Sequence, residues 1–539
     1  MQLRADARTA HDGGGAPKDT TRQRLLVVSN RLPVVLERDE HGALRGKPGS
    51  GGLVSALLPV LRDRGGTWIG WSGLAQQGTD AEVDRALDEA GRAFGFRLRG
   101  VPLTEAQVRD YYEGFANRVI WPLFHDSVDR CHFDPAWWDC YQHVNEKFAD
   151  AVLQAGAADF TWIHDYQLIG VAQCLRARQE AAGASADAAS DAPPEAGADK
   201  PVRARLGFFL HIPFPPLDLY LRLPWRFQLL RMLLAHDIVG FQTLRDRNNF
   251  AECVRRLLPE VRLVGRGHLL AAQLEERQCV VGVFPISIDF ASYARHAAQP
   301  AVAQEVARLK SAFPADRQLI LGVDRLDYTK GLPERLRAFD ALLRLHPELV
   351  QKVSLIQVVV PSREDIAEYA GLKAEVERLV SEINGRWTLP GGWVPIQYVY
   401  RPLTRTDLLA WYRCCQIALI TPLKDGMNLV AKEFCACSLE EDSVLVLSEF
   451  AGAAAQLHGG ALIVNPHDLL GVAQALHTAV TMPLSERRGR MRRLRRGISE
   501  RSVFWWVNTF LRAAIARDLS DFQRPDDYAP QDAVEALTV

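Results

Sequence analysis

Short runs of Val, Ile, Leu and Phe recur along the chain, and this pattern limits its fold more than any other feature. Longer amphipathic stretches separate the runs. Continuous apolar runs are typical of strands buried on both faces, and helices between them make the sheets parallel. We therefore predict an α/β protein with strands at Leu25–Val28, Phe160–Ile163, Leu206–Leu210, Ile238–Phe241, Leu319–Val323, Val353–Val359, Ile417–Ile420, Val444–Leu447 and Leu462–Val464.

The 539 residues are enough for two large domains. The strand–helix alternation restarts after Phe284–Ile288, which predicts two doubly wound sheets facing each other across a cleft. We place an N-terminal domain at 24–295, a C-terminal domain at 296–500 and a helix at 501–522 that packs back on the first domain. Residues 1–23 and 523–539 are predicted disordered tails, and the low-complexity segment 179–201 is a predicted mobile insertion.

The charge balance excludes a global electrostatic attraction to nucleic acid or an anionic membrane. There are 64 basic and 65 acidic side chains, for a formal net charge of -1. No apolar run approaches the roughly 18 residues of a membrane helix, and Met1–Arg22 has no signal-peptide core. We expect a cytoplasmic protein whose nine cysteines are reduced and mostly packed.

Polar residues gather directly after the predicted strands, at Ser29–Arg31, His164–Asp165, His211, Asp324–Arg325 and Thr421–Pro422. Open α/β sheets bind ligands outside the carboxyl ends of their strands. Two facing sheets would therefore supply two halves of one site.

The segment Lys424–Phe434 leaves a strand, turns at Asp425–Gly426 and enters a predicted helix. A helix N-terminus offers free N–H groups and a positive dipole end to phosphate, and Glu433 is placed to accept hydrogen bonds from sugar hydroxyls. An ordinary Asp-Gly turn capping a helix explains the pattern equally well. Pro48–Leu53 is a second glycine-rich loop before a helix, and it could bring backbone N–H groups to a phosphate or sugar, although its own pattern favours a plain flexible turn.

Arg325 and Lys330 lie five residues apart at the end of a predicted strand, and Arg363 follows another strand. Such cations are usually solvated or paired, and Asp324 and Asp327 could neutralise the first two. Three cations on one face of a cleft would also suit a substrate with more than one phosphate.

Two further patterns suggest chemistry that we do not favour. His164, Asp165 and His211 could suggest a metal, but no further ligand lies at a suitable spacing, so we predict no protein-held metal. The Arg-rich segment 487–498 could suggest nucleic-acid binding, but Met491, Leu494 and Ile498 share one helical face. We expect an amphipathic helix with solvated arginines, followed by Phe504–Trp506 as a core anchor.

Together these stretches resemble the retaining glycosyltransferases of the trehalose-6-phosphate synthase family, from about Leu25 to Leu519. The matching motifs are Val27–Arg31, Gly51–Gly52, Gly70–Gly73, Tyr111–Tyr112, Trp121–His125, His164–Tyr166, His211–Pro215, Arg325–Gly331 and Asp425–Glu433. The resemblance implies the GT-B fold, with two Rossmann-like domains.

The resemblance also implies the reaction: glucose moves from UDP-glucose to the anomeric hydroxyl of glucose 6-phosphate, with retention, in trehalose biosynthesis and osmoprotection. It implies no cofactor and no catalytic metal, and a homo-oligomer, dimer or tetramer. No side chain acts as nucleophile, and the leaving diphosphate takes the acceptor proton.

Site roles follow from the same resemblance. The implied catalytic residues are Arg325, Lys330, Asp165 and His211. Donor binding is implied for Gly51, Gly52, Arg325, Lys330, Leu403, Asp425, Gly426, Met427, Asn428, Leu429, Val430 and Glu433, acceptor binding for Arg31, Tyr112, Trp121, Asp165 and Arg363, and anomer selectivity for Trp121 and Ile212.

Four positions depart from the usual family pattern, and two rival functions remain. Asp126 stands where tyrosine is common, Gln167 replaces histidine, Lys424 replaces arginine and Gln456 replaces glutamate. A glucosylglycerol-phosphate synthase would use ADP-glucose and glycerol 3-phosphate, but its members lack the Ser29–Arg31 entry. A silent sugar-phosphate sensor would be expected to have lost Arg325, Lys330 or Glu433, and all three are present.

Overall fold

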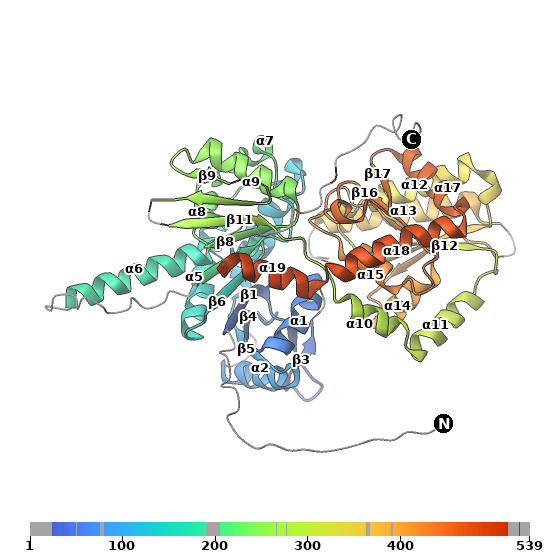
Figure 1. Ribbon diagram of the computed structural model, residues 1–539. Helices are drawn as coiled ribbons and strands as arrows, with labels where there is room; N and C mark the ends of the chain where they lie inside the picture. The colour runs from blue at the N-terminus through green and yellow to red at the C-terminus, as the bar shows by residue number, and fades with distance from the viewer. Residues whose placement is uncertain are drawn as a thin grey trace, which may run out of the picture.

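The computed structural model describes residues 24–49, 51–75, 80–189, 205–265, 267–275, 277–362, 367–389, 392–515 and 528. The chain forms two lobes joined side by side (Figure 1). The predicted tails apart from residue 528, residues 516–522 of the predicted last helix, most of the segment 179–201 and Arg363 lie outside the described residues. The first part of that segment, up to Ala189, continues a helix.

The N-terminal lobe is built on a nine-stranded sheet in the order β5-β4-β1-β6-β7-β8-β11-β10-β9. Seven neighbouring strands run parallel, and β10 and β9 add an antiparallel edge. The strands are β1 (Leu25–Arg31), β4 (Thr67–Trp71), β5 (Arg97–Gly100), β6 (Phe160–His164), β7 (Arg205–Phe209), β8 (Ile238–Phe241), β9 (Arg262–Val264), β10 (Leu269–Gln273) and β11 (Gln278–Val283), with a separate hairpin of β2 (Val34–Arg38) and β3 (Leu44–Pro48).

The C-terminal lobe holds a fully parallel six-stranded sheet in the order β14-β13-β12-β15-β16-β17. Its strands are β12 (Gln318–Arg325), β13 (Val353–Val360), β14 (Ile396–Tyr400), β15 (Ile417–Ile420), β16 (Val444–Ser448) and β17 (Leu462–Val464). All nine predicted strands are present in the two sheets. The apolar runs formed strands because both faces of each sheet are covered by helices.

The helices of the N-terminal lobe include an unusual 13-residue π-helix, η1, at Val108–Ile120. π-Helices are rare and often lie at functional sites. The other helices are α1 (Gly52–Arg64), α2 (Asp80–Phe94), α3 (Glu105–Gln107), α4 (Trp121–Phe124), η2 (Val128–Arg130), α5 (Pro135–Gln154), η3 (Tyr166–Leu168), α6 (Val171–Ala189), α7 (Leu217–Tyr220), α8 (Arg226–Leu234) and α9 (Leu244–Leu257).

The helices after β11 belong mostly to the C-terminal lobe. They are α10 (Phe290–Ala297), α11 (Pro300–Ser311), η4 (Tyr328–Lys330), α12 (Leu332–Leu345), η5 (Pro347–Leu349), α13 (Ala367–Trp387), α14 (Arg405–Cys414), α15 (Leu429–Cys437), α16 (Ala454–Leu457), α17 (Leu469–Thr481), α18 (Leu484–Glu500) and α19 (Val503–Ile515). Helix α10 contacts α14, α15 and α18. The chain therefore crosses between the lobes a few residues before 295.

The last two helices, α18 and α19, pack on different lobes. In α18, Met491, Leu494 and Ile498 are buried, which confirms the predicted amphipathic helix. Helix α19 then lies across the N-terminal lobe (Figure 1, dark red). Its Trp506 and Phe510 are buried against β6 and β7, where Phe510 stacks on Trp162 at 4.5 Å. The chain thus ties the two lobes together twice.

Candidate active site between the lobes

The carboxyl ends of the two sheets meet at loops that are far apart in sequence. A Cβ atom on Gly426, after β15, would overlap the carbonyl oxygen of His211, after β7. A Cβ atom on Gly52, at the start of α1, would lie 2.9 Å from Leu429 at the start of α15. Glycine is needed at position 426, where a Cβ atom would meet backbone, whereas at position 52 the Leu429 side chain could shift. Both predicted glycine-rich loops therefore lie where the lobes meet.

Arg325 and Lys330 have different environments. The Lys330 ammonium lies 2.6 Å from a carboxylate oxygen of Asp425, and both side chains are largely buried. Burial is the largest single influence on the pKa of Asp425 and would raise it, but the charge and hydrogen bond of Lys330, with the Asn428 hydrogen bond and nearby His125, together hold that pKa below its ordinary value. Arg325 ends β12, is exposed and makes no ion pair within the part of the chain that the structure describes. Arg325 is thus available to an anion.

The two neighbouring carboxylates, Asp324 and Asp327, are each held by other residues. Asp324 pairs with the fully buried Arg335. Asp327 instead caps η4, accepting hydrogen bonds from the backbone N–H and hydroxyl of Thr329 at 3.0 and 2.9 Å. The salt bridge that the structure shows for Lys330 is therefore with the distant Asp425, and that of Asp324 is with Arg335.

Helix α15 begins at the predicted phosphate-binding turn. Asn428 is its N-cap, with a left-handed backbone at φ 78°, and its side chain accepts a hydrogen bond from the Ala431 N–H at 3.1 Å. The Asn428 amide also donates to Asp425 at 3.1 Å. Met427 precedes this cap, and Leu429 and Val430 begin the helix. The first-turn N–H groups have no partners within their own helix, so they can face an anion.

Glu433 lies one turn into α15 and is held by two tyrosines. Tyr293 donates to one carboxylate oxygen at 2.8 Å, and Tyr412 donates to the other at 2.9 Å. Burial raises the pKa of Glu433 above its ordinary value, and the two hydrogen bonds oppose that rise. Neither tyrosine was predicted from the sequence. Leu403, half-buried in the loop before α14, completes the predicted donor set on this lobe.

His211 and Asp165 lie together on the N-terminal side. The Asp165 carboxylate accepts the backbone N–H of His211 at 3.1 Å, and Asp165 has φ 74°, a strained value for a residue with a side chain. The rings of His211 and His164 approach at 3.1 Å between Nε2 and Nδ1. Burial lowers the pKa of His211 to about 3, so its imidazole is neutral at neutral pH. The edge of Trp506, from α19, contacts this histidine at 6.3 Å between ring centroids.

The predicted acceptor residues form a second group. The Arg31 guanidinium, exposed at the end of β1, lies 4.2 Å from the Trp71 ring centroid and 5.5 Å from that of Tyr112. Trp121 is buried and packs on His125 at 4.1 Å, with Tyr166 at 5.8 Å. Ile212 is buried beside His211.

The four departures from the family pattern also have defined positions. Lys424 and Asp126 form an ion pair of 2.7 Å between the lobes. Gln456 accepts a hydrogen bond from the buried Lys432 ammonium at 2.7 Å. Gln167 is buried in η3. Sequence reasoning treated Asp126 and Lys424 separately, whereas the structure makes them partners.

Comparison with known proteins decides the family. A model of glycosyltransferase family 20 matches residues 23–516. The chain belongs to this family. Trehalose-6-phosphate synthase of Mycolicibacterium vanbaalenii is 39% identical over 502 residues, covering 92% of this chain and 96% of that protein. Its counterpart in Mycolicibacterium smegmatis is 40% identical over 497 residues, covering 91% and 92%.

Solved structures agree with that assignment and with the GT-B fold. A UDP-forming α,α-trehalose-phosphate synthase of Burkholderia xenovorans, in complex with glucose 6-phosphate, superposes with a TM-score of 0.78 at 33% identity and covers 92% of this chain and 100% of its own. An Escherichia coli family 20 structure bound with UDP-2-fluoro glucose gives a TM-score of 0.75 at 35% identity, covering 92% and 99%. No helix among the described residues is both long and apolar enough to span a membrane.

Proposed function

We propose that this family 20 glycosyltransferase transfers glucose from UDP-glucose to glucose 6-phosphate and forms α,α-trehalose 6-phosphate and UDP. Family membership supports the reaction class. The observation that carries it to this chain is the meeting of two half-sites: the Lys330–Asp425 pair and the start of α15 lie against the His211 loop of the other lobe. One half suits a diphosphate, and the other suits an uncharged sugar.

The C-terminal lobe would hold the donor. Arg325 and Lys330 would contact the diphosphate, together with backbone N–H groups of residues 425–430 and of Gly51 and Gly52. Glu433 would accept hydrogen bonds from the ribose, because each carboxylate oxygen can accept more than the one tyrosine hydroxyl it has. Leu403 would contact the uracil through its backbone.

The N-terminal lobe would hold the transferred glucose and the acceptor. Asp165 and the neutral His211 would bond sugar hydroxyls. Arg31 would contact the acceptor phosphate together with Arg363, and Tyr112 would lie beside it. Trp121 and Ile212 would form the apolar wall that selects the acceptor anomer.

The rate would come from charge stabilisation. Departure of UDP builds negative charge on the diphosphate, and the donors already placed on the C-terminal lobe stabilise that charge without reorganising. The leaving diphosphate would take the acceptor proton on the same face of the sugar, which gives retention. Contact between the lobes would exclude water and limit hydrolysis.

A nucleotide-release assay tests this proposal. The pure protein is incubated with UDP-, ADP- or GDP-glucose and either glucose 6-phosphate or glycerol 3-phosphate. We expect the pair UDP-glucose and glucose 6-phosphate to give the highest kcat/KM. We also expect Arg325→Ala to lower kcat by about 10²- to 10³-fold with little change in the KM for glucose 6-phosphate.

The control is Arg317→Ala, at the opposite, amino end of β12, whose guanidinium donates to a backbone carbonyl on the surface. That variant should keep full activity. Release with ADP-glucose and glycerol 3-phosphate alone would support the rival synthase, and no release with any pair would refute the enzyme proposal.

We also propose a cytoplasmic homo-oligomer, dimer or tetramer. The proposed substrates are a nucleotide sugar and a sugar phosphate, which are cytoplasmic metabolites. Cell fractionation and light scattering during size-exclusion chromatography test the two statements separately.

A further inference from the structure

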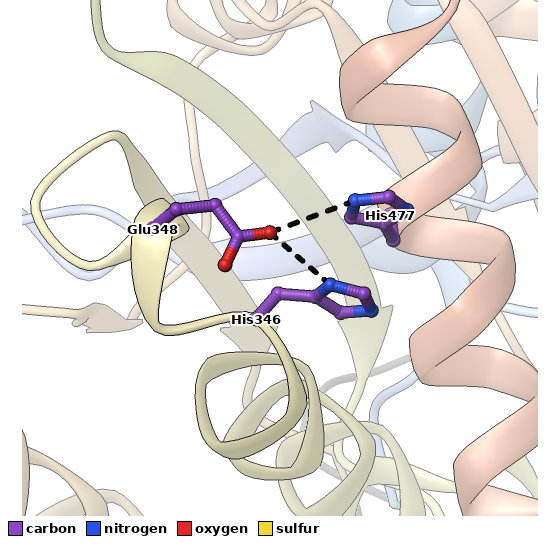
Figure 2. A group of neighbouring side chains, drawn as sticks. All are labelled: His346, Glu348 and His477. Carbon is purple, nitrogen blue, oxygen red and sulfur yellow. Dashed lines mark hydrogen bonds and ion pairs between the residues drawn. The ribbon is translucent and has the colours of Figure 1, made fainter.

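Three potential metal ligands gather on the C-terminal lobe, away from the proposed active site (Figure 2). His346 follows the end of α12, Glu348 lies in η5, and His477 lies in α17. Their ligand atoms lie within 4.8 Å of one another, and no other such group of three was found in the part of the chain that the structure describes.

The cluster lies near the amino-terminal ends of the strands of the C-terminal sheet. Helix α17 reaches the start of β12 there, because the Gln318 side chain donates to the Val480 carbonyl. Arg325, at the other end of β12, is seven residues further on, a distance of about 23 Å. A ligand bound at His346 would therefore not touch the donor site.

The distances fit a metal ion. One oxygen of Glu348 lies 3.2 Å from Nδ1 of His346 and 3.8 Å from Nε2 of His477. Ligand atoms bound to Zn²⁺ at about 2.0–2.2 Å in a tetrahedron are about 3.3–3.5 Å apart. We propose that His346, Glu348 and His477 bind one divalent transition-metal ion, for which Zn²⁺ is the probe, with water in the fourth position.

The side chains can make the adjustment that binding needs. Both imidazole nitrogens point toward the same Glu348 oxygen (Figure 2), and the two rings stack at 3.7 Å with 13° between their planes. An ion would enter beside that oxygen, and the rings would turn about their Cβ–Cγ bonds so that each in-plane lone pair meets the metal. The side chains of His346 and His477 are 18% and 25% exposed and Glu348 is 62% exposed, so surface water does not have to be expelled from a closed core.

Two imidazoles and one carboxylate favour Zn²⁺, Co²⁺, Ni²⁺ or Cu²⁺ over Mg²⁺ or Ca²⁺, which prefer sites made of oxygen ligands. The backbone positions of the ligands are also fixed, since α12 and α17 pack against each other. The ion would therefore link these helices and stabilise the lobe. Sequence reasoning missed the group because His477 is distant in the chain and was not considered with His346.

Isothermal titration of the untagged full chain with Zn²⁺ tests the proposal. We expect one ion per chain at this site, a higher thermal unfolding midpoint with Zn²⁺, and a visible Co²⁺ absorption typical of nitrogen and oxygen ligands. His477→Ala and Glu348→Gln should each lower the affinity at least about tenfold and abolish the thermal shift. Turnover without added metal should stay unchanged in both variants.

The control is His143→Ala, because His143 also lies near a glutamate, Glu146 at 3.6 Å, but has no second histidine in its group. This variant should bind Zn²⁺ like the parent. Zn²⁺ affinity that is unchanged by both His477→Ala and Glu348→Gln would place the ion elsewhere and overturn the proposal, as would an absence of binding to the parent chain.

Discussion

The ion pair between Lys424 and Asp126 is expected to hold the two lobes together during turnover. It joins the loop after α4 to the loop that leads into α15, at 2.7 Å. It is the only ion pair found between the two lobes within the described residues. The guanidinium of Arg130 also makes a contact between the lobes, 4.5 Å from the ring centroid of Tyr328. These contacts connect the acceptor side to the phosphate side of the proposed site.

The size of the effect follows from exposure. The Lys424 side chain is 11% exposed and that of Asp126 is 40% exposed. Because water screens the carboxylate, the pair is treated as an exposed pair, for which about 0.2–1 kcal/mol is typical. Because the lysine is largely buried, we take the upper end of that range, about 1 kcal/mol. That corresponds to about a fivefold change in kcat/KM if the pair forms only in the closed, reacting complex.

A double-mutant cycle measures this coupling. Asp126→Asn is the suitable change because Asp126 has φ 60°, which asparagine tolerates and alanine does not. We expect Asp126→Asn and Lys424→Met each to lower kcat/KM by about fivefold, and the double variant to lose little more than either single variant. The parallel cycle with Asp316→Asn and Lys352→Met, an exposed ion pair elsewhere on the surface, should show no effect on activity.

The result that would refute this reasoning is strict multiplication of the two single losses in the double variant. A second contrary result would be a loss for Lys424→Met far greater than for Asp126→Asn. In that case Lys424 contacts the substrate itself and not Asp126 during the reaction.

Three further results are expected. Tyr412→Phe removes one of the two hydrogen bonds to Glu433. This variant should raise the KM for the nucleotide sugar more than it lowers kcat. An effect on kcat alone would contradict a role of Glu433 in ribose binding. Trp506→Ala should lower the free energy of unfolding by about 3–5 kcal/mol in urea titrations, because this fully buried ring packs on Trp162 at 4.9 Å between ring centroids. A loss below about 1 kcal/mol would mean that the packing of α19 on the N-terminal lobe does not depend on Trp506. Burial lowers the pKa of His236 to about 3, so as the pH falls below about 6.5 the unfolded chain binds a proton at this histidine and the folded chain does not. The free energy of unfolding should therefore fall from pH 7 to 5, and His236→Gln should remove about 2 kcal/mol of that loss. An unchanged pH dependence in this variant would contradict a neutral buried ring.

The sequence was most informative where one local pattern decides the structure. Strands such as Ile417–Ile420 were predicted to the residue because a continuous apolar run between two helices has few alternatives. Strands without such a run were missed. Thr67–Trp71 has glycine and two tryptophans in five residues, and Arg97–Gly100, at the edge of the sheet, has arginine at alternate positions. Edge and mixed strands depend on their neighbours more than on their own composition.

The sequence predicted which residues gather at the site but not which of their side chains contact one another. Arg325 ends β12 as predicted and Lys330 follows it in η4, but the spacing left open whether nearby aspartates pair with them. The actual partner of Lys330 is Asp425, which is 95 positions away in sequence. The tyrosines that hold Glu433 were missed for the same reason, since their distance in the chain leaves no local signal.

Asp126 and Lys424 show what this difference implies. Taken one at a time, each looked like a change that could weaken the site, since a carboxylate replaces a tyrosine and a lysine replaces an arginine. Together they form a neutral ion pair, because the negative residue on one lobe meets the positive residue on the other at 2.7 Å. Lysine is a compact point charge and needs only one acceptor, whereas arginine would present a wider fork. Asp126 on the facing loop supplies the single acceptor that Lys424 needs. The two departures from the family pattern are therefore better understood as one contact between the lobes.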